Sequence, residues 1–233
     1  MPDLHWTVPV AHWSSWSLPA IPDIGFVEPM VRRRLSRLSK AALRVAHDCA
    51  EQRPNVRVVF ASRHGELHRT TEILHAICAD EPVSPTAFSL SVLNAMSGIF
   101  GIARKDRAPA NAISAGAETI GYALVEAYTQ YASDASVPVL VVYADEPADP
   151  LYGPVADEVQ PSAIAILLDA SAARGRLACR VMDRIEATME RPCGAAAFTS
   201  QGDALLHCLE HRTDTAWRHD ATLWQWSWHD DMA

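Results

Sequence analysis

The chain has 233 residues and a formal net charge of −8, with 49% hydrophobic and 21% charged residues. This length can bury a substantial core, and the composition excludes a mostly disordered chain. The negative charge argues against nucleic acid as the main partner, and no apolar run approaches the roughly 18 residues that a membrane span requires.

The first residues and the cysteines indicate a reducing compartment. The start of the chain lacks the basic-then-apolar pattern of a secretory signal. The five cysteines are odd in number, widely spaced and without a CxxC pair: Cys49, Cys78, Cys179, Cys193 and Cys208. We therefore expect a cytoplasmic protein with no disulfide framework, no metal and no cofactor.

Residues 1–29 contain five prolines and three tryptophans, Trp6, Trp13 and Trp16. Prolines exclude a long helix, and the aromatic side chains need cover. We predict an extended arm with one short strand packed on the body. The tryptophans either anchor this arm to the surface or contact a ligand.

An apolar stripe at spacings of four and three predicts a helix from Met30 to Glu51. Its basic residues lie largely off the stripe: Arg32, Arg33, Arg34, Arg37 and Lys40. This basic face is either solvated or in contact with an acidic partner.

The first strand is predicted over Val56–Ser62, followed by a helix over Leu67–Ala79. Between them, His64 lies close in sequence to Glu66 and His68, a set that is suited to acid–base chemistry. The alternative is a loop histidine whose neighbours satisfy its hydrogen bonds.

A third helix is predicted over Thr86–Ala103, with Ser84 as its cap. Small polar residues crowd one side of it: Ser89, Ser91, Asn94, Ser97 and Gly98. They permit close backbone approach, either within the chain or against a partner.

The segment 109–127 is the one around which we expect the fold to be organised. It predicts a buried strand over Asn111–Ser114, a turn of small residues at Ala115–Ala117 and a helix to about Ala132. The free N–H groups at such a helix start can meet a ligand or an oxyanion. A nucleophile would sit here, yet the turn has no Cys or Lys, and Gly116 has no side chain.

The next strand, Val137–Tyr143, is apolar on both faces and is typical of a central strand. Asp145 and Glu146 follow it, but a third acidic ligand for a metal is missing at suitable spacing. The acidic, proline-rich segment Asp149–Gln160 is predicted to be a covering or contact loop.

The remaining elements are a hairpin, a short helix and a strand. Ser162–Leu168 and Ala178–Ile185 are predicted to pair as the hairpin. After a small-residue loop at Pro192–Gly194, a helix is predicted over Gln201–His211. It carries His207 and His211 at the spacing of a zinc pair, but no third ligand is placed to complete a site.

Trp224, Trp226 and Trp228 alternate with polar residues and predict a one-faced edge strand, which this chain or another must cover. The chain is thus divided into an arm over 1–29, a domain over 30–190 and a Trp-rich extension over 191–233 that packs on the domain or on a partner.

The order of strand, small turn, helix and apolar strand resembles the surroundings of the reactive cysteine in β-ketoacyl synthases of the thiolase-like superfamily. Four segments resemble the short, N-terminal-type homologues called chain-length factors in aryl polyene pathways: RRRLSRLSKAALR (32–44), ASRHGELHRT (61–70), SPTAFSLSVLNAMSG (84–98) and VLVVYADEP (139–147). The resemblance covers residues 28–170 approximately, and its specificity lies in the joint order of these segments. It implies an α/β fold that is half of a thiolase-like fold, with a mixed central sheet covered by helices. It also implies that residues 30–190 form the β-ketoacyl synthase N-terminal-like domain.

The resemblance also implies site residues. The synthases carry a Thr-Ala-Cys-like tripeptide at the turn, so Ser114, Ala115, Gly116 and Ala117 form a vestigial nucleophile elbow with Gly116 at the cysteine position. Family members tend to have a histidine where this chain has Leu93. A partner interface or acyl pocket is expected at Phe88, Ser91, Leu93, Asn94, Gly98, Ile113 and Glu118.

The resemblance implies a non-catalytic subunit that forms a heterodimer with a catalytic ketosynthase and helps to shape the pocket that limits chain length. The second half of the fold, which supplies two catalytic histidines, is not expected within 233 residues. An acyl carrier protein is a further expected partner. Two alternatives stay open: an acyl hydrolase or transferase that uses Ser62 or Ser114 with His64, although no G-x-S-x-G elbow is present, and a stand-alone acyl-binding scaffold.

Overall fold

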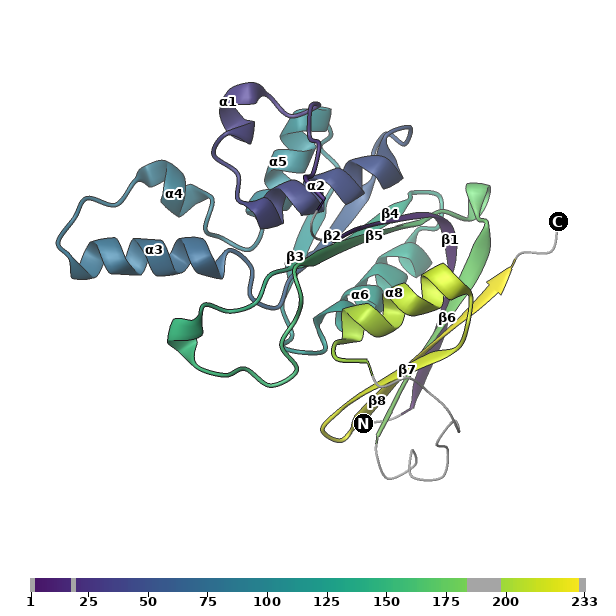
Figure 1. The fold of residues 1–233 in the computed structure, drawn as a ribbon. Coiled ribbons are helices and arrows are strands. Elements are labelled where there is room, and N and C mark those ends of the chain that lie inside the picture. Colours follow the sequence, from purple (N-terminus) through teal and green to yellow (C-terminus); the bar gives the residue numbers. More distant parts are fainter. Residues whose placement is uncertain (1–2, 18–19, 184–197, 231–233) are drawn as a thin grey trace.

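The computed structural model describes residues 3–17, 20–183 and 198–230. Within them, eight strands form one sheet in the order β3-β2-β4-β5-β1-β6-β8-β7 (Figure 1). β2 (Arg57–Ala61) is parallel to both β3 (Ala110–Ile113) and β4 (Val139–Asp145), and the other neighbouring pairs are antiparallel. The other strands are β1 (Leu4–Ser17), β5 (Ser162–Leu168), β6 (Gly175–Asp183), β7 (Thr215–His219) and β8 (Thr222–Asp230).

Helices cover both faces of this sheet, which confirms the predicted α/β class with a mixed central sheet. One core cluster contains residues of α2 and α5, and the other contains residues of α6 and α8. Figure 1 shows α3 and α4 projecting beyond the sheet. The helices are α1 (Pro29–Arg32), α2 (Arg37–Ala50), α3 (Leu67–Cys78), α4 (Pro85–Ser89), α5 (Ala95–Arg104), α6 (Thr119–Ser133) and α8 (Gln201–His211), with short 3₁₀ turns η1 (Pro150–Tyr152) and η2 (Ala170–Ala172).

Two predicted long helices are each divided in two. The prediction over Met30–Glu51 is wrong because Ser36 caps a new helix, α2, and accepts a hydrogen bond from the N–H of Ser39 at 2.9 Å. The prediction over Thr86–Ala103 is wrong because the chain leaves the helix after Ser89. The hydroxyls of Ser89 and Ser91 bond to nearby carbonyls there, which competes with helix continuation.

The N-terminal segment contributes much more than the predicted short strand. β1 has 14 residues and lies between β5 and β6, so these two strands do not form the predicted hairpin. Its first half pairs with β6 and its second half with β5. Pro9 falls in the first half, where only one neighbouring strand is present, and its missing N–H is therefore tolerated. Trp6 and Trp16 are core residues rather than surface anchors.

The pairing of β1 with β5 shifts register between Val10 and His12, which is a β-bulge at Ala11. Because side chains alternate along a strand, one extra residue exchanges the faces of all residues that follow. Val8 and Val10 accordingly belong to the core cluster of α6 and α8, whereas Trp16 belongs to that of α2.

The Trp-rich strand β8 is not an edge strand, because β7 pairs with its outer side. A two-residue turn at Asp220 and Ala221 joins β7 to β8, and Asp220 takes the left-handed conformation with φ of 48°. Trp224 and Trp226 are fully buried by this chain itself. The predicted loop at 192–194 lies outside the described residues.

Candidate functional site

The elbow, Ser114–Ala117, connects the carboxyl end of β3 to the start of α6. The prediction of a buried strand before the elbow is wrong, because β3 is a terminal strand of the sheet and its residues are exposed or half-buried. The hydroxyl of Thr119 accepts a hydrogen bond from the N–H of Ala115 at 2.9 Å and donates one to the carbonyl of Gly116 at 2.7 Å. Gly116 has φ of 58°, which favours glycine, and a Cβ placed there would meet no heavy atom within 4 Å. The turn therefore has the shape and the open space of a nucleophile site, but it carries no nucleophile.

Side chains of α8 and β8 contact the start of α6 and so support the elbow. The side chain of Gln201 on α8 accepts a hydrogen bond from the N–H of Gly121 at 2.8 Å. The indole of Trp224 donates to Glu118 at 2.8 Å. A Cβ on Gly121 would lie 2.6 Å from Trp224, so only glycine fits this approach. Glu118, a predicted pocket residue, is thus held by the chain's own tryptophan.

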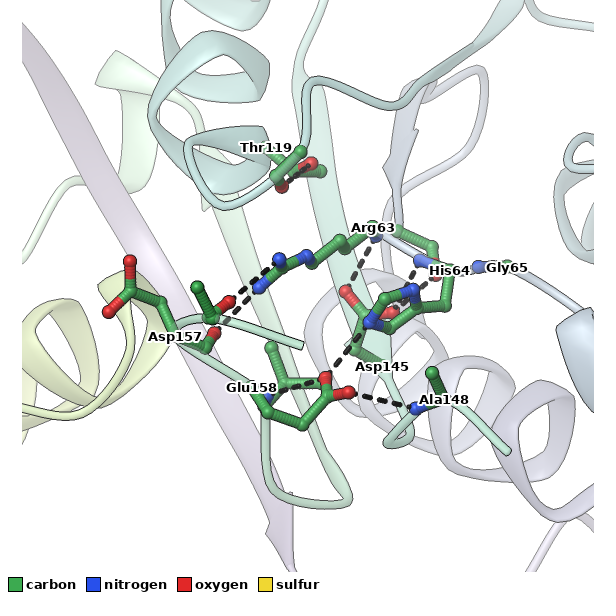
Figure 2. A network of polar contacts seen from close by, with 12 residues as sticks. Arg63, His64, Gly65, Thr119, Asp145, Ala148, Asp157 and Glu158 are labelled. Carbon is green, nitrogen blue, oxygen red and sulfur yellow. Dashed lines mark hydrogen bonds and ion pairs between the residues drawn. The ribbon is translucent and has the colours of Figure 1, made fainter. Parts of the chain in front are cut away.

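Asp145 organises the loop that follows β2 (Figure 2). Its buried carboxylate accepts hydrogen bonds from the hydroxyl of Ser62 at 2.9 Å and from the N–H groups of Arg63 and His64 at 2.6 and 3.0 Å. Burial raises the pKa of Asp145, and these three donors act against that rise. The carboxylate fixes the loop at the carboxyl edge of the sheet beside the elbow.

The same loop is tied to the acidic segment between β4 and β5. His64 lies 2.9 Å from Glu158, and the guanidinium of Arg63 donates to the carbonyls of Ala156 and Asp157 at 2.9 and 2.6 Å (Figure 2). His219 reaches the Asp157 carboxylate at 2.7 Å. The acidic segment therefore contacts both the loop after β2 and the strand β7. Its composition predicts a covering or contact loop but not these two contact sites.

The predicted acid–base residues do not meet. Glu66 accepts hydrogen bonds from the hydroxyls of Ser36 and Ser39, both at 2.6 Å, while His68 lies 3.9 Å from Asp149. His64 faces Glu158 rather than a serine. The arrangement satisfies these side chains and does not form a catalytic set.

Neither candidate serine is prepared for attack. Ser62 is fully buried, and its hydroxyl donates to Asp145 and accepts from the N–H of Gly65 at 2.8 Å. The hydroxyl of Ser114 donates to the carbonyl of Arg63 at 3.0 Å. A serine nucleophile requires a base within hydrogen-bond reach, and here the partners are a carboxylate already bound by two backbone donors and a carbonyl.

Several predicted interface residues gather beside β3. A hollow of about 560 Å³, which we call the β3 hollow, is lined by residues including Leu93, Asn94 and Ile113. A second hollow of about 560 Å³ is lined by residues that include Gly98 and Ile102 of α5. Phe88 is 61% exposed on α4, and the hydroxyl of Ser91 is bonded to the Phe88 carbonyl at 2.8 Å.

Neither a metal-binding cluster nor a membrane-spanning helix is found among the described residues. In residues 3–17, 20–183 and 198–230, no group of three or more His, Cys, Asp or Glu side chains is placed to hold a metal ion. His207 and His211 instead stack on each other with ring centroids 4.1 Å apart. None of the helices in this part of the chain has the length and apolarity needed to cross a membrane.

The described cysteines predict a selective chemical labelling pattern. Cys49, Cys179 and Cys208 are buried, and burial raises the pKa of each thiol, that of Cys208 to about 12. Cys78 is exposed. Because the thiolate is the reactive form, iodoacetamide at neutral pH should modify Cys78 and spare the other three in the folded protein. Peptide mass spectrometry checks this, with urea-unfolded protein as the control; modification of a buried cysteine in the folded chain would contradict it. Cys193 lies outside the described residues.

Comparison with known proteins identifies the family. The model of the β-ketoacyl synthase N-terminal domain matches residues 6–227. The fold is similar to a chain in the solved structure of a ketosynthase (ApeO) in complex with its chain length factor (ApeC) from Xenorhabdus doucetiae. The TM-score is 0.74 at 26% identity, covering 95% of this chain and 99% of that chain.

Two further structures share the fold at lower identity. The ishigamide ketosynthase/chain length factor matches with a TM-score of 0.67 at 14% identity, covering 97% of this chain and 99% of that chain. A β-ketoacyl synthase from Burkholderia phymatum STM815 matches with a TM-score of 0.58 at 12% identity, covering 69% of this chain and 50% of that chain. No curated protein matches the chain. The family match spans nearly the whole chain, and the chain belongs to the β-ketoacyl synthase N-terminal domain family.

Proposed function

We propose that this protein is a non-catalytic β-ketoacyl synthase-like subunit, a chain-length factor, that forms a heterodimer with a catalytic ketosynthase in polyketide-type biosynthesis such as that of aryl polyenes. The observation that carries the proposal is the elbow with Gly116 at its centre. Covalent acyl transfer needs a nucleophile, and a glycine offers only hydrogen at that position. The complex of a ketosynthase with its chain length factor, at 26% identity, supports the pairing.

The partner is proposed to cover the β3 side of the molecule. β3 is the terminal strand of the sheet in the described residues, so its outer backbone groups have no strand neighbour. Exposed edges invite pairing with another chain. Exposed apolar side chains lie on the elements before β3: Leu74 and Ile77 on α3, Phe88 on α4, Val92 after α4 and Ile102 on α5. A ketosynthase subunit would remove these side chains from water.

A partner at this position would also close the β3 hollow. Leu93, Asn94 and Ile113 then become wall residues of a chamber between the subunits. In this proposal the volume of those side chains limits how long an acyl chain on the ketosynthase cysteine can grow. Gly116 adds space without adding charge near the chamber.

An acyl carrier protein is proposed as a second, acidic partner. Arg33, Arg34 and Arg37 are exposed at the end of α1 and the start of α2, in a chain whose net charge is −8. Opposite charge raises association rates and orients the encounter. Since Cys49, Cys78, Cys179 and Cys208 are all free thiols, the cytoplasm is the proposed compartment.

Covalent labelling of the separate subunits tests the proposal. The chain is expressed alone and together with a tagged ketosynthase, and both preparations are incubated with a radiolabelled acyl thioester. We expect co-purification at equal stoichiometry, label on the ketosynthase and no label on this chain. Stable label on this chain alone, or failure to co-purify, would refute the assignment.

A further inference from the structure

The bulge in β1 determines which face His12 occupies. Past the bulge, Ser14 bonds to Asp48 of α2 at 3.2 Å, and Trp16 packs in the core beneath α2. His12 shares their face because side chains two residues apart along a strand point the same way. If side chains alternated regularly through Ala11, His12 would instead face the side of α6 and α8, as Val10 does.

On this face His12 borders a cavity of about 340 Å³, which we call the His12 hollow. Its walls are the bulge of β1, the last turn of α2 with the loop that follows it, and the segment just before β6. The charged or titratable side chains that line it are His12, Asp48, Glu51, Arg53 and Arg174, together with the thiol of Cys49. The hollow lies at the end of α2 that leads into β2, whereas the elbow lies where β3 ends.

The acidic groups of the hollow each have a basic side chain beside them. Asp48 lies 2.9 Å from the guanidinium of Arg44, and Glu51 lies 3.7 Å from His47.

Of the basic groups, Arg53 is paired with Asp169 at 3.1 Å. The side chains of His12 and Arg174 make no hydrogen bond or ion pair with any other residue in the described part of the chain. The side chains of His12 and Arg174 are therefore left to donate hydrogen bonds and to supply positive charge in the hollow.

We propose that the His12 hollow binds a small phosphate or carboxylate anion between the imidazole of His12 and the guanidinium of Arg174. A guanidinium binds either group through two parallel hydrogen bonds, and an imidazolium adds a third, charge-assisted donor. Free carbonyl oxygens at the end of a helix repel an anion. At the end of α2, however, the carbonyl of Ala50 already accepts a hydrogen bond from the N–H of Arg53 at 3.0 Å. The volume leaves room for an organic group attached to the anion, since small-molecule sites begin at about 300 Å³.

Binding of the proposed anion is coupled to protonation of the His12 imidazole. Burial, and then the charge of Arg174, lower the pKa of His12, whereas the charge of Asp48 raises it. Arg53, which also lines the hollow, is held in an ion pair with Asp169, and Glu51 lies 3.7 Å from the imidazole of His47. A bound anion stabilises the imidazolium, so binding takes up a proton and becomes tighter as the pH falls.

A titration of the full chain tests the site. Inorganic phosphate, glycerol 3-phosphate and acetate are added in separate arms while the imidazole Cε1 proton of His12 is followed by NMR and the affinity by calorimetry. We expect a saturable shift of the His12 signal and tighter binding at about pH 6 than at about pH 8. Saturation by the phosphates identifies a phosphate site and saturation by acetate a carboxylate site. No saturable shift in any arm overturns the proposal.

Three variants separate a specific site from general electrostatic attraction. Arg174→Gln should weaken binding about tenfold, because it removes the charge-assisted contact. Its side chain is exposed and has no partner among the residues that the structure describes, so folding should be unaffected. Arg218→Gln removes one exposed charge from β7, outside the hollow, and should leave the affinity unchanged. His12→Gln should leave only the pH dependence that comes from the ligand's own ionisation. Equal losses in Arg174→Gln and Arg218→Gln, or unaltered pH dependence in His12→Gln, overturn the proposal.

Discussion

Trp224→Ala is expected to lower the free energy of unfolding by about 3 to 5 kcal/mol, the range for truncation of a large buried aromatic residue. The Trp224 side chain is fully buried. It packs edge-to-face against Trp6 and Tyr122, with ring centroids 6.3 and 5.2 Å away. Its indole also donates to Glu118 at the start of α6. Equilibrium urea denaturation measures the change.

Trp224→Phe is the matched control for this prediction. It keeps an aromatic ring among Trp6 and Tyr122 but removes the indole N–H that Glu118 accepts. Its loss of stability should be clearly smaller than that of Trp224→Ala, because most of the buried apolar contact remains. If Trp224→Ala unfolds at nearly the wild-type urea concentration, the support of the elbow by β8 is unimportant.

Ile102→Asp is expected to weaken binding of the proposed ketosynthase partner by at least about 30-fold, which corresponds to a loss of roughly 2 kcal/mol at an interface hot spot. Ile102 is 78% exposed on α5, beside the edge strand β3. Burying a carboxylate at that position in a heterodimer would leave it without a partner. Calorimetric titration of the ketosynthase with each variant measures the effect.

Ile21→Asp provides the comparison for this variant. Ile21 is 93% exposed in the segment between β1 and α1, and it does not line either hollow beside β3. It should bind the ketosynthase as the wild type does, and both variants should unfold at the wild-type temperature because neither side chain is buried. Equal binding by Ile102→Asp and the wild type would exclude α5 from the interface.

Local elements are predictable where apolar runs are bounded by turn residues. The sequence predicts α3, α6 and α8 closely, although of these three only α8 begins with a side-chain cap, the hydroxyl of Ser200. β2 and β4 are predicted from short apolar runs bounded by turn residues. The elbow between β3 and α6 is predicted as well, since small residues between a strand and a helix have few other uses.

Long-range pairing is what the sequence does not reveal. Nothing local in residues 4–17 indicates that this strand separates β5 from β6, so two runs adjacent in sequence suggest a hairpin that does not exist. The hydrophobic stripe from Met30 to Glu51 likewise continues across the break at Ser36, because apolar spacing does not register a cap. The contacts of Glu118 with Trp224 and of Gly121 with Gln201 join residues far apart in the chain, and no sequence pattern signals them.

The central place of β1 has a consequence for how the protein is made. Leu4 pairs with Val181 and Val10 with Leu168, so the first strand leaves the ribosome long before either neighbour has been translated. Contacts at such sequence separation slow folding and leave apolar segments exposed meanwhile. Trp6, Val8 and Val10 remain unpaired throughout that interval, so these apolar side chains are open to aggregation during synthesis.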